Sequence, residues 1–372
     1  MSLFTGQASA PAPNGLRLVA IVATHDRPGH LRRTVRALLQ SPPAELAALV
    51  VVDNASRDDT RAWLSCVPDP RLHVLRLERN MGGAGGFAAG LEHARRTLDP
   101  DWYLLMDDDA RPAPGALGAF HDSDLKGWDA IAGAAYLPQG GICDTNRPSR
   151  DPFASWRQFL CTVRHGREGF HLGPVDYAGA RVVAVDAASF VGLFLSRRAL
   201  DLAGLPDRNL FIYCDDTLQT LRLSRAGGRI GFNPALHFEH DTELPGAESA
   251  SMPLWKLYYK HRNSLILYRE AAGWLFWPAC VVVLARWLAA ARGHRGQRRA
   301  YLGLLARAVL HGLRGRTAFS HEQVLDWARM TPATPAREPE GQDTDTDCSV
   351  LNSVPSSCLQ MKANAPGAAT RT

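Results

Sequence analysis

Short apolar runs alternate with segments of helical periodicity over the first 110 residues, and this alternation limits the fold more than any other feature. Strands that alternate with helices predict parallel βαβ units and an α/β fold with a mostly parallel sheet flanked by helices. The expected strands are Leu16–Ala23, Leu49–Val52, His73–Leu77 and Trp102–Met106. A helix is expected over Pro28–Gln40, a second begins near Asp58, and a third follows the glycine-rich loop and continues through Arg96.

Polar residues follow each of these apolar runs. Ligands of parallel sheets bind beyond the carboxyl ends of the strands. The residues that fall at those ends are Thr24, Asp53, Asn80 and Asp107–Asp109. A binding site is therefore expected at this edge of the sheet.

The aspartate triplet Asp107–Asp109 directly follows a buried apolar run. Like charges placed side by side repel unless a cation lies among them. A divalent cation bound by carboxylate and phosphate oxygens removes that repulsion, and Asp107 and Asp109 lie on the same side of an extended segment. A solvated acidic turn is the alternative interpretation.

A glycine-rich loop, Asn80–Gly90, precedes the triplet and opens a helix. Glycines such as Gly82 and Gly83 let the backbone approach a ligand closely, and backbone N–H groups at a helix start can face a diphosphate. The pattern Gly83-x-Gly85-x-x-Ala88 also resembles a dinucleotide fingerprint, which on its own is weak support for an NAD(P)-dependent oxidoreductase. The sequence contains no P-loop motif.

Other polar residues each allow two interpretations. Asp53 either accepts a hydrogen bond from a nucleotide base or caps the following helix. Asp215 and Asp216 begin a helix, where the helix dipole stabilises them, and either could also act as a general base. His237 and His240 follow about 20 residues later, and either could complete a metal site.

The C-terminal part of the chain changes in character. Ala271–Ala291 is nearly continuous apolar sequence, but Pro278 and Arg286 interrupt it. A central arginine costs about 2.5 to 3.5 kcal/mol in a spanning helix. An interfacial helix on an anionic membrane surface is therefore expected, supported by basic residues that include Arg292, Arg295, Arg298, Arg299, Arg307, Arg314 and Arg316.

Composition excludes few classes of protein. The chain has 372 residues and a formal charge of +5, which does not indicate a nucleic-acid partner. Seven cysteines, an odd number without a Cys-x-x-Cys pair, fit a reducing compartment. The first fifteen residues lack the pattern of a secretory signal, so we expect a cytoplasmic protein, peripheral at the inner face of the membrane.

Taken together, these motifs resemble family 2 glycosyltransferases of the GT-A (Rossmann-like) fold over residues 16–265. The loop Asn-x-Gly-Gly-x-Gly-Gly-Phe with an aspartate triplet is most similar to the galactofuranosyltransferase branch. The matching segments are Thr24–Pro28, Val52–Ser56, Asn80–Phe87, Asp107–Asp109, Phe211–Asp216 and Lys260–Asn263. One residue departs from that branch, because Cys214 stands where a tryptophan usually precedes the aspartate pair.

The resemblance implies an inverting, metal-dependent transfer from a nucleotide-sugar donor such as UDP-galactofuranose to a glycan or polyprenol-linked acceptor, with Mn²⁺ or Mg²⁺ as cofactor. By position, Asp216 would be the base, and Asp107, Asp109 and His240, or less closely His237, would bind the metal. The residues that would bind the donor are Thr24, Asp53, Asn80, Gly82, Gly83, Asp107, Asp108, Arg262 and Asn263. Residues 111–175 would shape an acceptor cleft.

The implied organisation has four parts: a flexible N-terminus (1–15), a GT-A catalytic domain (16–250), a basic helical region associated with the membrane (251–330) and a disordered tail (331–372). Two alternatives stay open within the same fold. One is a transferase that uses dTDP-rhamnose, and the other is a non-catalytic protein that binds nucleotide sugars.

Overall fold

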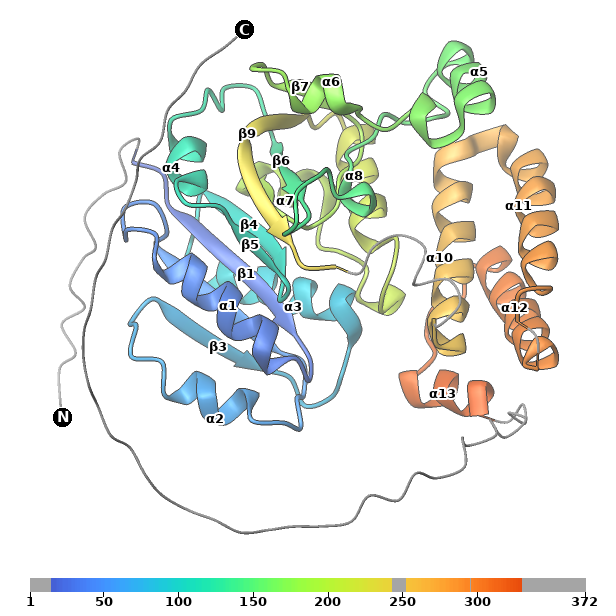
Figure 1. Cartoon of the computed structure of the whole chain (residues 1–372), viewed down its shortest axis with the longest axis horizontal. Helices are drawn as coiled ribbons and strands as arrows, with labels where there is room; N and C mark the ends of the chain where they lie inside the picture. The colour runs from blue at the N-terminus through green and yellow to red at the C-terminus, as the bar shows by residue number, and fades with distance from the viewer. Residues whose placement is uncertain (1–14, 243–251, 295, 330–372) are drawn as a thin grey trace, which may run out of the picture. The chain divides into compact units, whose positions relative to one another are not determined.

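The computed structural model describes residues 15–242, 252–294 and 296–329 (Figure 1). The predicted disordered tail and, apart from Gly15, the predicted flexible N-terminus lie outside these residues. Cys348 and Cys358 also lie outside them, and the described cysteines are all free.

One mixed sheet forms the centre of the described structure, with the strand order β3-β2-β1-β4-β8-β6-β9-β5, and β7 pairing with β9. Strands β3, β2, β1 and β4 are parallel, as are β6 and β9, whereas β8, β5 and β7 pair antiparallel with their neighbours. The bounds are β1 Leu18–Thr24, β2 Ala48–Asp53, β3 Leu72–Arg76, β4 Trp102–Asp107, β5 Ala110–Pro112, β6 Ala130–Tyr136, β7 Val183–Val185, β8 Leu193–Ser196 and β9 Ile230–His240.

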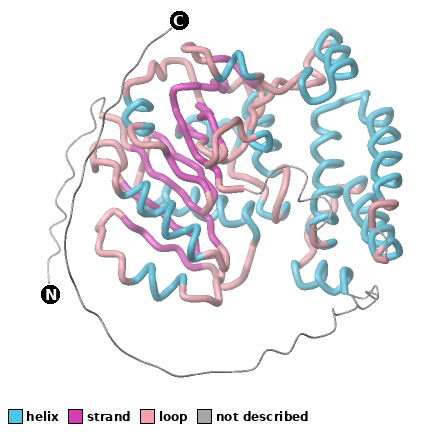
Figure 2. The backbone as a smooth tube through the Cα atoms, in the orientation of Figure 1, coloured by secondary structure: helices cyan, strands magenta, loops and turns pink. Residues whose placement is uncertain are grey.

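Helices cover both faces of this sheet, which Figure 2 shows as strands enclosed by helices. Strand β1 is buried at every residue, and its side chains alternate between two separate cores. Helices α1, α2 and α4 contribute to one core, and α3, α7 and α8 to the other. The bounds are α1 Pro28–Leu39, α2 Thr60–Ser65, α3 Gly82–Thr97, α4 Ala116–His121, α7 Arg197–Ala203 and α8 Asp215–Arg225. The predicted α/β class with helices on both faces is confirmed.

The segment between β6 and β7 contains little sheet, in keeping with its Gly- and Pro-rich sequence. Its longer helix, α5, has no buried residue. The elements here are α5 Trp156–His165, α6 Pro174–Tyr177 and the 3₁₀ turns η1 Asp144–Asn146 and η2 Gly166–Gly169. A third 3₁₀ turn, η3 Arg208–Leu210, lies just before α8.

The C-terminal region is helical, as expected. Its elements are α10 Leu254–Ala272, η4 Gly273–Leu275, α11 Phe276–Ala290, α12 Arg298–Leu313 and α13 His321–Arg329. Helices α10 and α11 lie side by side (Figure 1), because the chain reverses at Gly273, where φ is +52°. The stretch Leu254–Ala290 is long and apolar enough to cross a membrane by length and composition.

Glycines in α3 let this helix lie close to the sheet. A Cβ at Gly90 would come within 2.5 Å of Ile21 Cγ2 and 2.9 Å of Val52 Cγ2. Both neighbours are β-branched and fully buried, so their methyl groups cannot move aside easily. The glycine-rich sequence is therefore required in part for packing.

We expect Gly90→Ala to lower the thermal melting temperature, because overpacking a closed core costs about 1 to 3 kcal/mol. Gly29→Ala is the matched control, since Gly29 also lies in a helix but a Cβ there meets nothing within 4 Å. Gly29→Ala should leave the free energy of unfolding unchanged or raise it by up to about 1 kcal/mol. Equal melting temperatures for the two variants would contradict the close approach of α3 to the sheet.

Candidate active site

The carboxyl ends of β1, β2 and β4 lie next to one another at one edge of the sheet. Thr24 pairs with Asp53, and Ala23 pairs with Asp107. The parallel register therefore gathers the polar residues that the sequence placed after these strands.

A group that could hold a metal ion lies at this edge, formed by Asp107, Asp109 and His240. Their ligand atoms all lie within 4.8 Å of one another, and His240 Nε2 is 3.1 Å from Asp109 Oδ1. His240 reaches the triplet because β9 pairs with β5, which places it opposite Ala110. His237 is exposed, and its ring contacts Tyr136. The structure therefore brings together the two aspartates and only one of the two candidate histidines.

The charges in this group shift one another's pKa values. Burial alone would lower the pKa of His240, but hydrogen bonds with Asp109 and Cys143 and the charge of Asp109 raise it to about 10. Burial alone would raise the pKa of Asp109, but His240 and Arg27 lower it to about 2. Burial and the charge of Asp109 raise the pKa of Asp107 to about 6. The protonated His240 thus balances Asp109, and a cation bound to this group would take the place of the His240 proton.

Asn146 orients the histidine, which the sequence did not indicate. Its Oδ1 accepts a hydrogen bond from His240 Nδ1 at 2.7 Å, and this arrangement turns Nε2 toward the carboxylates. Asn146 Nδ2 donates to Ser189 Oγ at 2.9 Å. Asn146 lies in the loop-rich segment, where no periodicity or motif marked it.

Asp108 is not part of the metal group. Its carboxylate accepts from Thr24 Oγ1 at 2.7 Å and from Arg27 Nη1 at 2.8 Å. Arg27 also donates to Asp109 at 2.8 Å, so it bridges two members of the triplet. Burial nevertheless raises the pKa of Asp108 to about 7. Arg27 was not among the predicted site residues, although it lies within the Thr24–Pro28 motif.

The expected donor-binding residues on β2 and the glycine loop are bonded within the protein. Asp53 is buried and accepts from Ser56 N and from Arg76 Nη1, and Asn80 Oδ1 accepts from Gly82 N. Gly82 has φ of +70°, and a Cβ there would lie 2.0 Å from Phe211 O. Gly83, by contrast, has open space around it. Contacts of these residues with a donor stay predictions.

The aspartate pair begins α8 after an unusual loop. Phe211, Tyr213 and Cys214 all have φ between +62° and +71°, a conformation that is costly for residues with a side chain. Burial raises the pKa of both Asp215 and Asp216. The pair therefore follows a strained loop, with Asp215 buried and Asp216 half-buried.

Arg262 and Asn263 support this loop. Asn263 Nδ2 donates to the backbone oxygens of Leu210, Ile212 and Tyr213, and Arg262 Nη2 donates to that of Leu210. The Arg262 side chain is 0% exposed. This differs from the expected contact with donor phosphates, because burial and the loop carbonyls already occupy both side chains.

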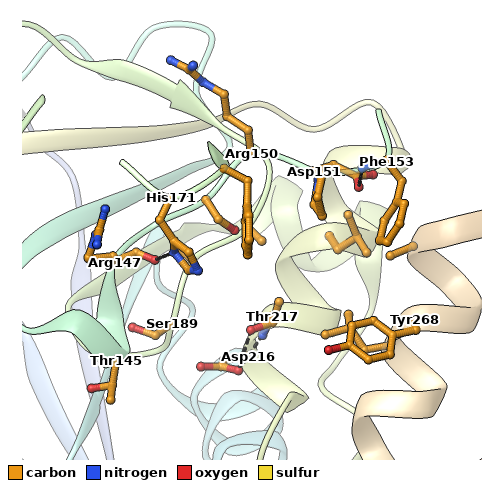
Figure 3. A pocket seen from close by; sticks show the side chains of 18 residues that line it. Thr145, Arg147, Arg150, Asp151, Phe153, His171, Ser189, Asp216, Thr217 and Tyr268 are labelled. Carbon is orange, nitrogen blue, oxygen red and sulfur yellow. Dashed lines mark hydrogen bonds between the residues drawn. The ribbon is translucent and has the colours of Figure 1, made fainter. Parts of the chain in front are cut away.

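Two cavities adjoin the metal group and the aspartate pair. One, of about 250 Å³, has Asp216 in its wall (Figure 3). Tyr268 and Phe153 lie on one side of it, and His171 and Ser189 on the other. The second, of about 730 Å³, is lined by Arg27 and Asp109 and reaches Lys256 of α10. The arrangement offers separate spaces for two ligands.

Comparison with known proteins finds a matching family model and several similar relatives. Residues 19–190 match the profile of Glycosyl transferase family 2. The galactofuranosyltransferase GlfT1 of Mycolicibacterium smegmatis is 28% identical over 269 residues, which cover 66% of this chain and 80% of the relative. GlfT1 of Mycobacterium tuberculosis strain H37Rv is 29% identical over 214 residues, which cover 56% of this chain and 64% of the relative.

Solved structures show a weaker overall similarity. The mannosyltransferase PcManGT from Pyrobaculum calidifontis, in complex with GDP-Man and Mn²⁺, is 20% identical with a TM-score of 0.47. That alignment covers 87% of this chain and 90% of PcManGT. On the sequence matches, residues 19–190 resemble a family 2 glycosyltransferase domain, and the chain is similar to galactofuranosyltransferases.

Proposed function

We propose that this glycosyltransferase transfers galactofuranose from UDP-galactofuranose, with inversion, to a lipid-linked or growing surface glycan at the cytoplasmic face of the membrane. The observation that carries the proposal is that a possible metal group and the aspartate pair Asp215–Asp216 each adjoin a cavity. The names of the relatives favour galactofuranose as the sugar, and the cavities provide for a donor and an acceptor.

The donor diphosphate would lie at the Asp107, Asp109 and His240 group. Two carboxylates and an imidazole suit Mn²⁺, and suit Mg²⁺ if water completes its coordination. A bound divalent cation would stabilise the charge that develops on the leaving nucleoside diphosphate. Arg27, which contacts Asp108 and Asp109, adds a positive charge beside the same space.

The acceptor hydroxyl would enter the smaller cavity and give its proton to Asp216. A carboxylate whose pKa is raised by burial is a stronger base than an exposed one, and the pKa of Asp216 is raised in this way. Direct attack by the hydroxyl on the anomeric carbon breaks the bond to the diphosphate and inverts the configuration. One carboxylate suffices for this step, which leaves Asp215 to support the helix start.

Asp216→Asn should reduce transfer by at least about 100-fold, because general-base catalysis contributes about 10²- to 10⁴-fold. UDP binding, measured by calorimetry, should persist. Asp215→Asn is the matched comparison and should retain more activity. Near-normal turnover of Asp216→Asn would reject its role as the base.

Removal of the metal group should abolish metal-dependent activity. We expect Asp107→Ala with Asp109→Ala, and separately His240→Ala, to weaken Mn²⁺ binding by at least about tenfold, measured by electron paramagnetic resonance. His237→Ala is the control and should bind Mn²⁺ as the parent protein does. Activity that persists in excess chelator would overturn the metal assignment.

A panel of nucleotide sugars with Mn²⁺ tests the donor without an acceptor. UDP-galactofuranose should raise the melting temperature more than dTDP-rhamnose does, and it should be hydrolysed slowly. A larger shift with dTDP-rhamnose would favour a rhamnosyltransferase. Binding without hydrolysis or transfer to any acceptor would favour a non-catalytic protein, and a shift with NAD(P) alone would favour an oxidoreductase.

A further inference from the structure

Helix α5 carries an apolar stripe that no part of the described structure covers. Trp156, Leu160 and Val163 are 60%, 48% and 67% exposed. Their spacing of four and three residues places them on one face of the helix. A stripe of this size on a helix with no buried residue indicates an interaction surface.

Helix α11 carries a second exposed apolar stripe. Trp277, Val281 and Leu288 are exposed and recur at helical spacing, while only Phe276 and Cys280 of this helix are buried. Trp274, in the turn between α10 and α11, is 77% exposed, more than Trp277 or Trp156. Both stripes therefore present tryptophan to the outside.

An aromatic chain connects the two stripes. The rings of Trp156 and Phe159 are 5.4 Å apart and those of Phe159 and Phe153 are 6.2 Å apart. Phe153 in turn packs against a cluster from α10 and α11 that includes Ala272 and Phe276. Figure 1 shows α5 beside the turn that joins these two helices. The elements that carry the two stripes therefore adjoin, and we name the two exposed stripes together the α5–α11 surface.

Arginine predominates around this surface, because Glu168 and Glu270 at its edges are already paired with Arg147 and Arg222. Residues 271–320 contain eight arginines and no Asp or Glu. Residues 152–167, which include α5, contain three arginines and again no acidic residue. Arg157, Arg164, Arg286 and Arg292 are exposed beside the apolar stripes. Exposed tryptophan and aliphatic side chains among arginines match the interface of an anionic bilayer.

We propose that the α5–α11 surface lies in the headgroup region of an anionic membrane and brings the Asp216 cavity to a lipid-linked acceptor. Phe153, Tyr268 and Ala271 line that cavity, and Phe153 and Tyr268 also pack against the α10–α11 cluster. The cavity therefore adjoins the surface. The role in acceptor capture rests on the proposed function, whereas the membrane contact does not.

The geometry favours an interfacial position over a spanning one. Helix α11 has 15 residues, so it is about 22 Å long at about 1.5 Å per residue, shorter than the hydrocarbon core of about 30 Å. Arg286 lies in the same helix. Helix α10 is not free to extend it, because its Tyr258, Arg262 and Leu265 are buried in the protein.

A second copy of the chain suits the surface less well. A two-fold contact would place the same surface of each copy against the other. The arginines of the two copies, which outnumber the acidic residues beside the surface, would then face one another. Anionic lipid headgroups supply the opposite charge instead.

Vesicle co-sedimentation of the full chain tests the membrane contact. The parent protein should bind phosphatidylcholine vesicles containing phosphatidylglycerol more strongly than pure phosphatidylcholine, and salt should weaken the binding. Trp156→Ser with Leu160→Ser and Val163→Ser should reduce partitioning at least about tenfold, as should Trp277→Ser with Val281→Ser. Val175→Ser, an exposed valine on α6, is the matched control and should partition as the parent does.

Three results would overturn the proposal. The first is that both stripe variants partition as the parent does. The second is that the parent resists carbonate extraction, which marks a spanning helix, and the third is concentration-dependent dimerisation that the stripe variants remove. Thermal stabilisation by UDP checks that each variant is folded. Stripe variants should transfer normally to a soluble acceptor but at least about tenfold more slowly to a vesicle-bound one. Loss of turnover in all proteins, with vesicle binding intact, would instead contradict the proposed function.

Discussion

The repulsion among buried aspartates is the constraint on which the site depends. Asp107–Asp109 and the pair Asp215–Asp216 lie close enough for their charges to affect one another, and burial strengthens that repulsion. Arg27 and His240 offset part of it through direct contacts with the triplet. A divalent cation and a leaving diphosphate fit this pattern, because the cation supplies the remaining positive charge. Burial also raises the pKa of Asp216 and makes it a stronger base.

Helix α10 links the parts of the protein that the proposed reaction requires. Asn263 and Arg262 bond the carbonyls of the strained loop before α8, which offsets the cost of its positive φ values. Farther along the same helix, Tyr268 lines the cavity at Asp216. The C-terminal end of α10 leads through η4 into α11, which carries the exposed apolar stripe. One helix therefore connects the position of the base, the acceptor cavity and the proposed membrane contact.

Much of the N-terminal half could be predicted from sequence, because local patterns decide it. The runs before Thr24, Asp53 and Asp107 became β1, β2 and β4, and parallel pairing then placed their ends together. The pattern did not identify β6 or β9 as strands. Strand β6 is mostly alanine and glycine. Strand β9 contains Pro234, and its register with β6 shifts after Gly133 of β6. Neither strand therefore shows the usual β-branched alternation.

The sequence by itself determined which residue types end the strands, where α8 begins and which segments are apolar, since periodicity and capping act within a few residues. Tertiary structure alone decided that His240 rather than His237 contacts Asp109, and that Asn146 orients His240. It also decided that Asn263 donates hydrogen bonds to the loop before α8. These contacts join residues about 50 to 130 positions apart. No local pattern encodes them, because they depend on which strands pair and on how the helices pack against the sheet.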